Sequence, residues 1–292
     1  MPWRRALGIL IVAGGSLALA RPLWLLLEGV DPGGALSLAW QAGLLAALAT
    51  ALGALPALGT RTLSERSQDA LLGFGAGVML AACAFSLILP GLEAARRLSS
   101  PAGAALQLAL AVLLGSWALM ALDRWLPHEH FIKGREGPGA QAKAQRLRRT
   151  ALFVIAVSLH NLPEGLAMGV AFAGGDREAA TSLSLAIAIQ DLPEGFVIAM
   201  ALMAVGYARH RALLVGAASG LIEPLGALLG AWVVSQQPLL LPWGLGFAAG
   251  AMLFVISHEI IPESHRKGHE RWATQGLMLG FALMMVLDTA LG

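Results

Sequence analysis

Two related stretches in this chain are HNLPEG at residues 160–165 and QDLPEG at residues 190–195. Each lies within an apolar run longer than the ~20 residues that a helix needs to cross a bilayer. Each motif starts about ten residues from the end of its run, which at ~1.5 Å per residue is close to the bilayer midplane. The two stretches therefore predict membrane-spanning helices that are packed around a polar centre.

The composition of the whole chain agrees with a membrane protein. Of its 292 residues, 57% are hydrophobic and only 13% are charged, whereas soluble domains carry about 25% charged residues. The 35 glycines suit helices that pack closely in a bilayer. The only cysteine, Cys83, excludes an intrachain disulfide and a cysteine-rich metal cluster. The net charge is +2, and the Lys and Arg residues are scattered over short loops. This distribution is explained by the orientation of the protein in the membrane, so no nucleic-acid partner is expected.

Hydropathy predicts an all-α integral membrane protein whose residues 1–292 form a single transmembrane domain. The expected helices are 6–27, 34–58, 70–92, 102–122, 150–173, 179–205, 211–234, 240–263 and 273–290. The first run could also be a cleaved signal peptide, because two arginines precede it. Its length and the lack of a small-residue cleavage site favour a retained helix.

The distribution of Lys and Arg predicts the orientation. With the N-terminus in the cytoplasm, sixteen of the 20 basic residues face the cytoplasm and four face outside. The C-terminus is then outside. The longest loop, 127–149, is glycine-containing and charged, so it is expected to be a flexible cytoplasmic linker. It divides the eight later helices into three before and five after.

The two motifs present ligand-type side chains to one side of each helix. Within each motif the first and fifth residues are i,i+4 neighbours, and the second lies three residues before the glutamate. These candidate ligands are His160, Asn161, Glu164, Gln190, Asp191 and Glu194. Buried amides also bridge membrane helices, so spacing alone leaves the roles of Asn161 and Gln190 open.

A carboxylate at the midplane costs roughly 2.5–3.5 kcal/mol even on the mild insertion scale. Glu223, near the middle of the 211–234 helix, adds a fourth carboxylate at this depth, and no Lys or Arg shares it. Two divalent cations would neutralise the four groups, with protons as the second choice. Glu223 could instead be a structural carboxylate that pairs with a hydroxyl such as that of Ser219.

The prolines of the two motifs also indicate a binding site. Pro163 and Pro193 lack an N–H and free the carbonyls of Leu159 and Ile189, so each is expected to break its helix. Broken membrane helices are tolerated where they line a cavity, and paired breaks commonly mark the binding site of a transporter.

The types of ligand narrow the choice of ion. Imidazole, carboxylate and amide oxygen suit zinc and its first-row neighbours, whereas magnesium and calcium prefer oxygen alone and copper(I) prefers sulfur. The chain contains no G-x-x-x-x-G-K-[ST] loop, so ATP is not expected to drive it directly. The residues thus indicate a metal transporter, with the metal as transported substrate and no organic cofactor.

With these motifs the chain resembles the ZIP (Zrt/Irt-like protein) family of metal transporters, and especially its bacterial members. The resemblance covers residues 34–290, an eight-helix core in a 3+2+3 arrangement, and leaves 6–27 as an extra N-terminal helix. It implies a bacterial cytoplasmic membrane, import into the cytoplasm and an elevator-type movement. Zn²⁺ or Cd²⁺ would be the substrate, with iron and manganese as further ions. A homodimer is left open.

The resemblance also implies a two-metal site. The first ion would be held by His160, Glu164, Gln190, Glu194 and a methionine of the 70–92 helix, Met79. The second would be held by Asn161, Asp191 and Glu223, with Glu164 and Glu194 bridging the two. Many eukaryotic members have His-Glu in place of Gln190-Asp191, which bears on the selectivity of the first site. Without the family, Met79 would be interpreted as a core residue.

Further polar residues lie at the predicted ends of the helices. His258, Glu259 and Glu263 form either an exit relay or an interfacial polar helix end. Asp288 and Glu93 either attract cations to an entrance or are solvated. Ser86 either lines the same path or bonds its own helix.

One pair of histidines, His128 and His130, lies in the linker. A His-Glu-His run can bind metal, but a solvated loop is the simpler interpretation.

Two other functions compete with metal transport. His258-Glu259 resembles the start of the H-E-x-x-H motif of metallohydrolases, but Pro262 stands where the second histidine belongs. A proton-coupled carrier could use the carboxylates as a relay, but a relay needs no amide ligands. The chain is therefore predicted not to be an enzyme.

Overall fold

A computed structural model describes residues 34–59, 64–125, 160–204 and 206–291 of the chain. These residues form helices and short connections and contain no strand, which confirms the all-α prediction. The predicted 6–27 helix, the 127–149 linker with His128 and His130, and the first part of the 150–173 helix lie outside the described residues.

The elements are, in chain order, α2 (Ala35–Ala54), η1 (Leu55–Leu58), α3 (Glu65–Ala82), η2 (Cys83–Ile88), α4 (Leu89–Arg96), α5 (Pro101–Trp125), α7 (Arg177–Ala204), α8 (Arg209–Ser219), α9 (Ile222–Gln236), η3 (Pro238–Leu240), α10 (Leu241–Val255), η4 (Ile256–Ile260), α11 (Ile261–Ser264) and α12 (Glu270–Leu291). Residues 160–173, between α5 and α7, are also helical. Seven helical runs in the described part of the chain are long and apolar enough to cross a membrane.

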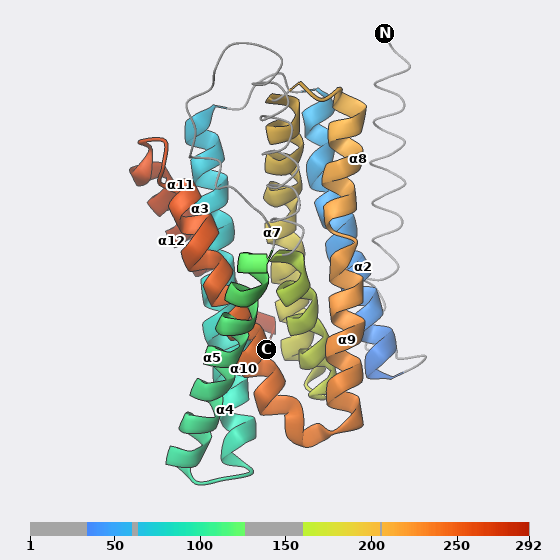
Figure 1. Cartoon of the computed structure of the whole chain (residues 1–292), viewed down its shortest axis with the longest axis vertical. Helices are drawn as coiled ribbons and strands as arrows, with labels where there is room; N and C mark the ends of the chain where they lie inside the picture. The colour runs from blue at the N-terminus through green and yellow to red at the C-terminus, as the bar shows by residue number, and fades with distance from the viewer. Residues whose placement is uncertain (1–33, 60–63, 126–159, 205, 292) are drawn as a thin grey trace.

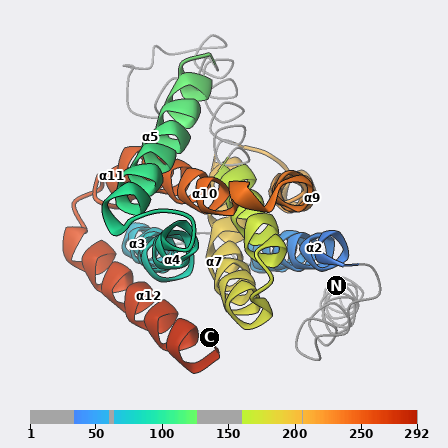
Figure 2. The same ribbon diagram turned by 90° about the horizontal axis from the view of Figure 1, so that it is seen from below.

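The spanning helices form a bundle with α7 near its centre. Figure 1 shows the α4–α5 and α9–α10 turns at one end of the bundle and the starts of α3 and α8 at the other. Seen along the bundle, α7 lies between α2 on one side and α3 on the other (Figure 2). This central position places the second motif of the sequence in the interior.

Glycines tie some of these helices together at backbone distance. The first group consists of α2, residues 160–173, α7, α8 and α9, and we call it the α2–α7–α9 group. A Cβ atom at Gly53 would collide with the backbone of Leu192, and one at Gly169 with the backbone of Ala227. Small residues allow such approaches, which replace side-chain packing by closer backbone contact.

A second group is tied in the same way and is called here the α3–α5–α10–α12 group; it also includes α4 and α11. Gly77 abuts the backbone of Leu277, and Gly250 abuts that of Val112. Among the described glycines, those that approach the other group, such as Gly244, meet side chains only. The bundle therefore consists of two tightly packed groups with a looser contact between them.

Two wide helical turns interrupt the second group. In η2 and η4 the hydrogen bonds span five residues, as in the bond from the N–H of Ile261 to the carbonyl of Ile256. A proline, Pro90 or Pro262, follows each segment at the second position of the next helix. Because proline supplies no N–H, a carbonyl of the preceding turn lacks its usual hydrogen-bond donor, and the turn widens.

The prediction that the motif prolines break their helices is wrong for the second motif. Pro193 lies inside α7, which continues from Arg177 to Ala204. The break is instead between α8 and α9, in the run predicted as one helix over 211–234. There α8 ends at Ser219 and α9 begins at Ile222, with Gly220 packed against α2 between them and Pro224 in the first turn of α9.

Candidate metal centre

Carboxylates from both motifs converge in the interior of the bundle. One oxygen each from Glu164, Asp191 and Glu194 lies within 4.8 Å of the others. Glu164 and Asp191 are fully buried, and Glu194 is partly buried. Three acidic groups at this spacing repel one another strongly unless a cation or protons lie between them.

The glycine that ends each motif brings the ligands together. Gly165 packs against the carbonyl of Glu223 on α9, and Gly195 packs against the carbonyl of Thr50 on α2. A larger residue at either position would separate the helices that carry the acidic groups. The final residue of the Leu-Pro-Glu-Gly core is thus needed for close helix contact next to the site.

Glu223 lies in the first turn of α9, directly after the break in the helix. Its side chain is fully buried. The N-terminal end of a helix favours negative charge, so the break itself helps to hold a carboxylate here. One oxygen, Oε1, accepts hydrogen bonds from Asn161 Nδ2 at 2.9 Å and from Thr50 Oγ1 at 3.3 Å. The other, Oε2, is buried and has no partner within the described ranges of the chain.

The hydroxyl that reaches Glu223 belongs to Thr50, not to Ser219. The Ser219 hydroxyl donates to the carbonyl of Gly216 in its own helix, and the Ser219 carbonyl accepts from Asn161 at 3.3 Å. Thr50 was not singled out from the sequence. A hydroxyl four residues before the end of an apolar helix gave only a weak signal, because such groups commonly bond their own backbone.

Many oxygens of the site are buried and have no hydrogen-bond donor among the residues that the structure describes. Gln190 donates to Glu164 Oε1, but its own carbonyl oxygen has no partner. In the described part of the chain, the buried oxygens of the site without a partner are Asn161 Oδ1, Glu164 Oε2, Gln190 Oε1, both carboxylate oxygens of Asp191, Glu194 Oε1 and Glu223 Oε2. An unsatisfied buried polar group costs about 1–3 kcal/mol, and a charged one costs more. A divalent cation among these oxygens would remove the penalty.

His160, the first residue of the first motif, faces a residue of the second group. Its side chain is buried, and its Nε2 lies 2.8 Å from Glu259 Oε2 in η4. The two atoms are at ion-pair distance but are not aligned as a hydrogen bond. The predicted ligand and the predicted exit residue are therefore in contact.

Met79 and Cys83 lie one turn apart on the segment from α3 to η2. Met79 is 2% exposed and belongs to the apolar core, so its role as a ligand stays a prediction. Cys83 is also buried, and its Sγ lies 3.8 Å from the carbonyl of Ala249. Cys83 is therefore packed within the apolar core.

The predicted entrance residues are only partly brought together. Ser86 Oγ donates to Asp288 Oδ1 at 2.8 Å, joining η2 to the last turns of α12. Ser86 is buried, so its hydroxyl and the Asp288 carboxylate form a polar pair within the bundle. Glu93 is exposed on α4.

At the opposite end, the other predicted exit residues are more open than Glu259. His258 is exposed, and its ring stacks on Phe254 with centroids 4.9 Å apart. Glu263 pairs with Arg266 at 2.8 Å, one turn later. Glu259 in η4 and Glu263 in α11 are i,i+4 neighbours. The two carboxylates therefore follow one another from His160 towards the end of the helix.

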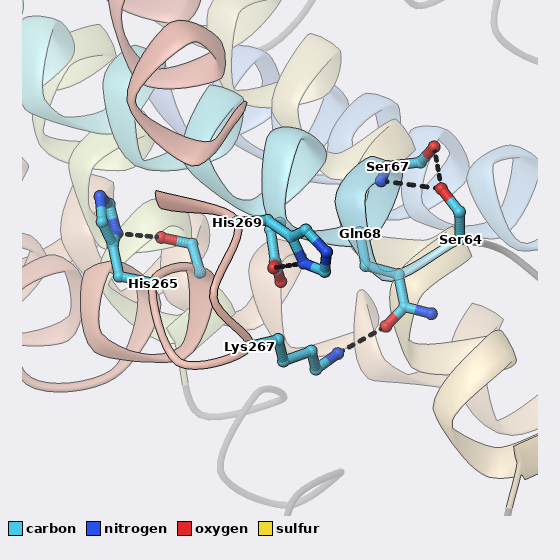
Figure 3. Close-up of polar contacts among 8 residues, drawn as sticks. Ser64, Ser67, Gln68, His265, Lys267 and His269 are labelled. Carbon is cyan, nitrogen blue, oxygen red and sulfur yellow. Dashed lines mark hydrogen bonds and ion pairs between the residues drawn. The ribbon is translucent and has the colours of Figure 1, made fainter. Parts of the chain in front are cut away.

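A separate polar cluster joins the start of α3 to the α11–α12 loop (Figure 3). His269 Nδ1 lies 3.1 Å from Oδ2 of the fully buried Asp69. Nearby, Lys267 donates to Gln68 at 2.7 Å. These contacts connect two helices of the same group, so they brace the bundle away from the carboxylates.

Comparison with known proteins identifies relatives that match most of the chain. The family model described as ZIP Zinc transporter matches residues 126–288. Zinc transporter ZIPB of Bordetella bronchiseptica is 57% identical over 245 residues, which cover 84% of this chain and 78% of that protein. Zinc transporter GufA of Myxococcus xanthus is 48% identical over 252 residues, covering 86% and 98%. Human zinc transporter ZIP11 is 36% identical over 159 residues, covering 52% and 46%.

Proposed function

Because the chain belongs to the ZIP family of multi-pass membrane transporters, we propose that it imports zinc across a bacterial cytoplasmic membrane through the buried carboxylate site. One observation carries the proposal. Glu164, Asp191 and Glu194 each offer an oxygen within 4.8 Å of the others, and each keeps a buried oxygen without a donor among the described residues. Such a set is costly when empty of cations and becomes favourable when a divalent ion is shared among the groups.

The site is proposed to hold two ions. Asn161, Asp191 and Glu223 would bind one ion, since each retains a buried oxygen without a partner. His160, Gln190 and Met79 would complete the other, and Glu164 and Glu194 would bridge the two. The first set offers oxygen only, whereas the second adds imidazole nitrogen and thioether sulfur. The mixed set would accept the softer ion Cd²⁺ as well as Zn²⁺, with iron and manganese as weaker substrates.

Transport is proposed to follow an elevator-type movement of the α2–α7–α9 group against the α3–α5–α10–α12 group. The two groups are each held together by backbone contacts at glycines, and side chains alone meet at the glycines between them. Helices that interlock at backbone distance resist sliding, whereas side-chain contacts can rearrange. All four midplane carboxylates lie in the α2–α7–α9 group, so they would move together.

The ends of the path are proposed from the polar pairs that flank the site. With the N-terminus in the cytoplasm, the pair of Ser86 and Asp288 lies towards the outside and would attract arriving cations. Glu259, beside His160, and Glu263, one turn later, would accept the ion on the cytoplasmic side.

Uptake of zinc into proteoliposomes tests the proposal. Glu164→Ala and Glu194→Ala should each abolish uptake, because each removes a group shared by two ions, and Asn161→Ala should reduce uptake less. Glu178→Ala is the matched control, since Glu178 lies exposed in the first turn of α7, the helix that carries Glu194. Wild-type rates in both bridging variants would refute the metal site. Parallel assays with cadmium, manganese and iron would rank the ions.

A further inference from the structure

One buried polar group next to the carboxylates has no assigned role. Thr50 lies in the last turns of α2 and is fully buried. Its hydroxyl is 3.3 Å from Glu223 Oε1 and 3.3 Å from the carbonyl of Ala46. A hydroxyl has one proton, so it donates to one of these oxygens at a time. A carboxylate is the stronger acceptor, which favours donation to Glu223.

Thr50 also lies where three helices meet. Its carbonyl is in contact with Gly195 of α7, and its side chain faces Gly220 at the break between α8 and α9. A Cβ atom at Gly220 would stand 3.0 Å from both Thr50 Cβ and Thr50 Oγ1. The backbone on both sides therefore fixes the direction in which the hydroxyl points.

The two carboxylate oxygens of Glu223 therefore have different surroundings. Oε1 takes both donors, from Thr50 and Asn161, while Oε2 is left free and buried. A carboxylate anchored through one oxygen presents the other in a fixed direction. Support of this kind orients ligands at metal sites, and its removal typically costs about 10–100-fold in metal affinity.

We propose that Thr50 is a positioning residue for the second ion: its hydroxyl holds Oε1 of Glu223 so that Oε2 points at the metal. The inference rests on the proposed zinc site and adds to it a residue that supplies no ligand atom. Thr50 would thus connect α2 to an ion held by the other helices of its group.

A pair of opposite substitutions separates this role from simple packing. Thr50→Val keeps the shape and removes the hydroxyl, whereas Thr50→Ser keeps the hydroxyl and removes the methyl group. If Thr50 positions Glu223, valine should be harmful and serine tolerated. If Thr50 only fills space among the helices, valine should be tolerated and serine harmful. Thr181→Val is the matched control, because Thr181 is buried on α7 ten residues before Asp191.

The experiment is zinc titration by calorimetry of the full chain in detergent, with uptake measured in parallel. Thr50→Val should weaken binding of one of the two proposed ions about tenfold and raise the KM for uptake more than it lowers the maximal rate. Thr50→Ser and Thr181→Val should match the wild type. Unchanged zinc binding in Thr50→Val, in a preparation where Glu194→Ala loses it, would overturn the positioning role and leave the proposed function standing. No zinc binding by the wild type would overturn both.

Discussion

Replacing Gly165 by alanine tests whether close helix packing sets the geometry of the site. A Cβ atom at this position would lie 3.0 Å from both Glu223 C and Ala227 N, and closer still to the carbonyl oxygen of Glu223. Carbon and oxygen atoms in ordinary contact are separated by about 3.5 Å. The start of α9 would therefore have to move away by up to about 1 Å.

Such a displacement is large on the scale of metal coordination. Distances between ligand and metal in working sites hold to within about 0.2 Å, so Glu223 would no longer reach an ion fixed by the other carboxylates. Overpacking itself costs about 1–3 kcal/mol. We expect Gly165→Ala to fold with somewhat reduced stability and to lose one of the two proposed zinc ions, although no ligand has been changed.

The assay is zinc stoichiometry by calorimetry together with uptake in proteoliposomes. Gly216→Ala is the control in the same group, because its Cβ would meet neighbours at 3.4 Å and beyond, which is ordinary contact. It should bind and transport like the wild type. Full stoichiometry and wild-type uptake in Gly165→Ala would refute the link between backbone approach and ligand placement.

Three further predictions follow from other parts of the structure. Asp288→Ala should raise the zinc concentration needed for half-maximal uptake and leave the maximal rate nearly unchanged, and an unaltered concentration dependence would contradict a role at the entrance. His269→Ala should lower the free energy of unfolding in detergent by about 2 kcal/mol, since it leaves the buried carboxylate of Asp69 without its histidine partner. Adding Asp69→Asn should restore part of that loss. Single cysteines should be labelled by a membrane-impermeant reagent from outside at Ser99 and from the cytoplasm at His210, and the reverse pattern would refute the orientation.

Most of the helical architecture could be predicted from hydropathy, because a helix in a bilayer must satisfy its own backbone. The predicted run 240–263 corresponds to a span that extends from Pro238 to Ser264. The interruptions were harder to predict. Pro193 is accommodated within α7, while the break falls at Gly220, where α2 approaches too closely for a side chain. That distance is a property of the packed bundle and has no signature in the local sequence.

The acidic residues of the site could be predicted because charge at the midplane is expensive and therefore informative. Glu164, Asp191 and Glu194 do lie together, and the periodicity of each motif gave the reason. Thr50 could not be found in this way, because a hydroxyl in an apolar helix costs little and can bond its own backbone. Its relation to Glu223 joins residues 173 positions apart, and only the packing of α2 against α9 creates it.

The two proposed ions differ in how they relate to the two groups of helices. Every proposed ligand of the second ion, from Asn161 to Glu223, lies in the α2–α7–α9 group, so that ion could travel without losing a ligand. The first ion would also contact Met79, and its ligand His160 faces Glu259, both in the other group. Movement of one group against the other would have to break these contacts. The first ion would then be the one that is exchanged, and the second, held within a single rigid group, would neutralise the carboxylates throughout the cycle.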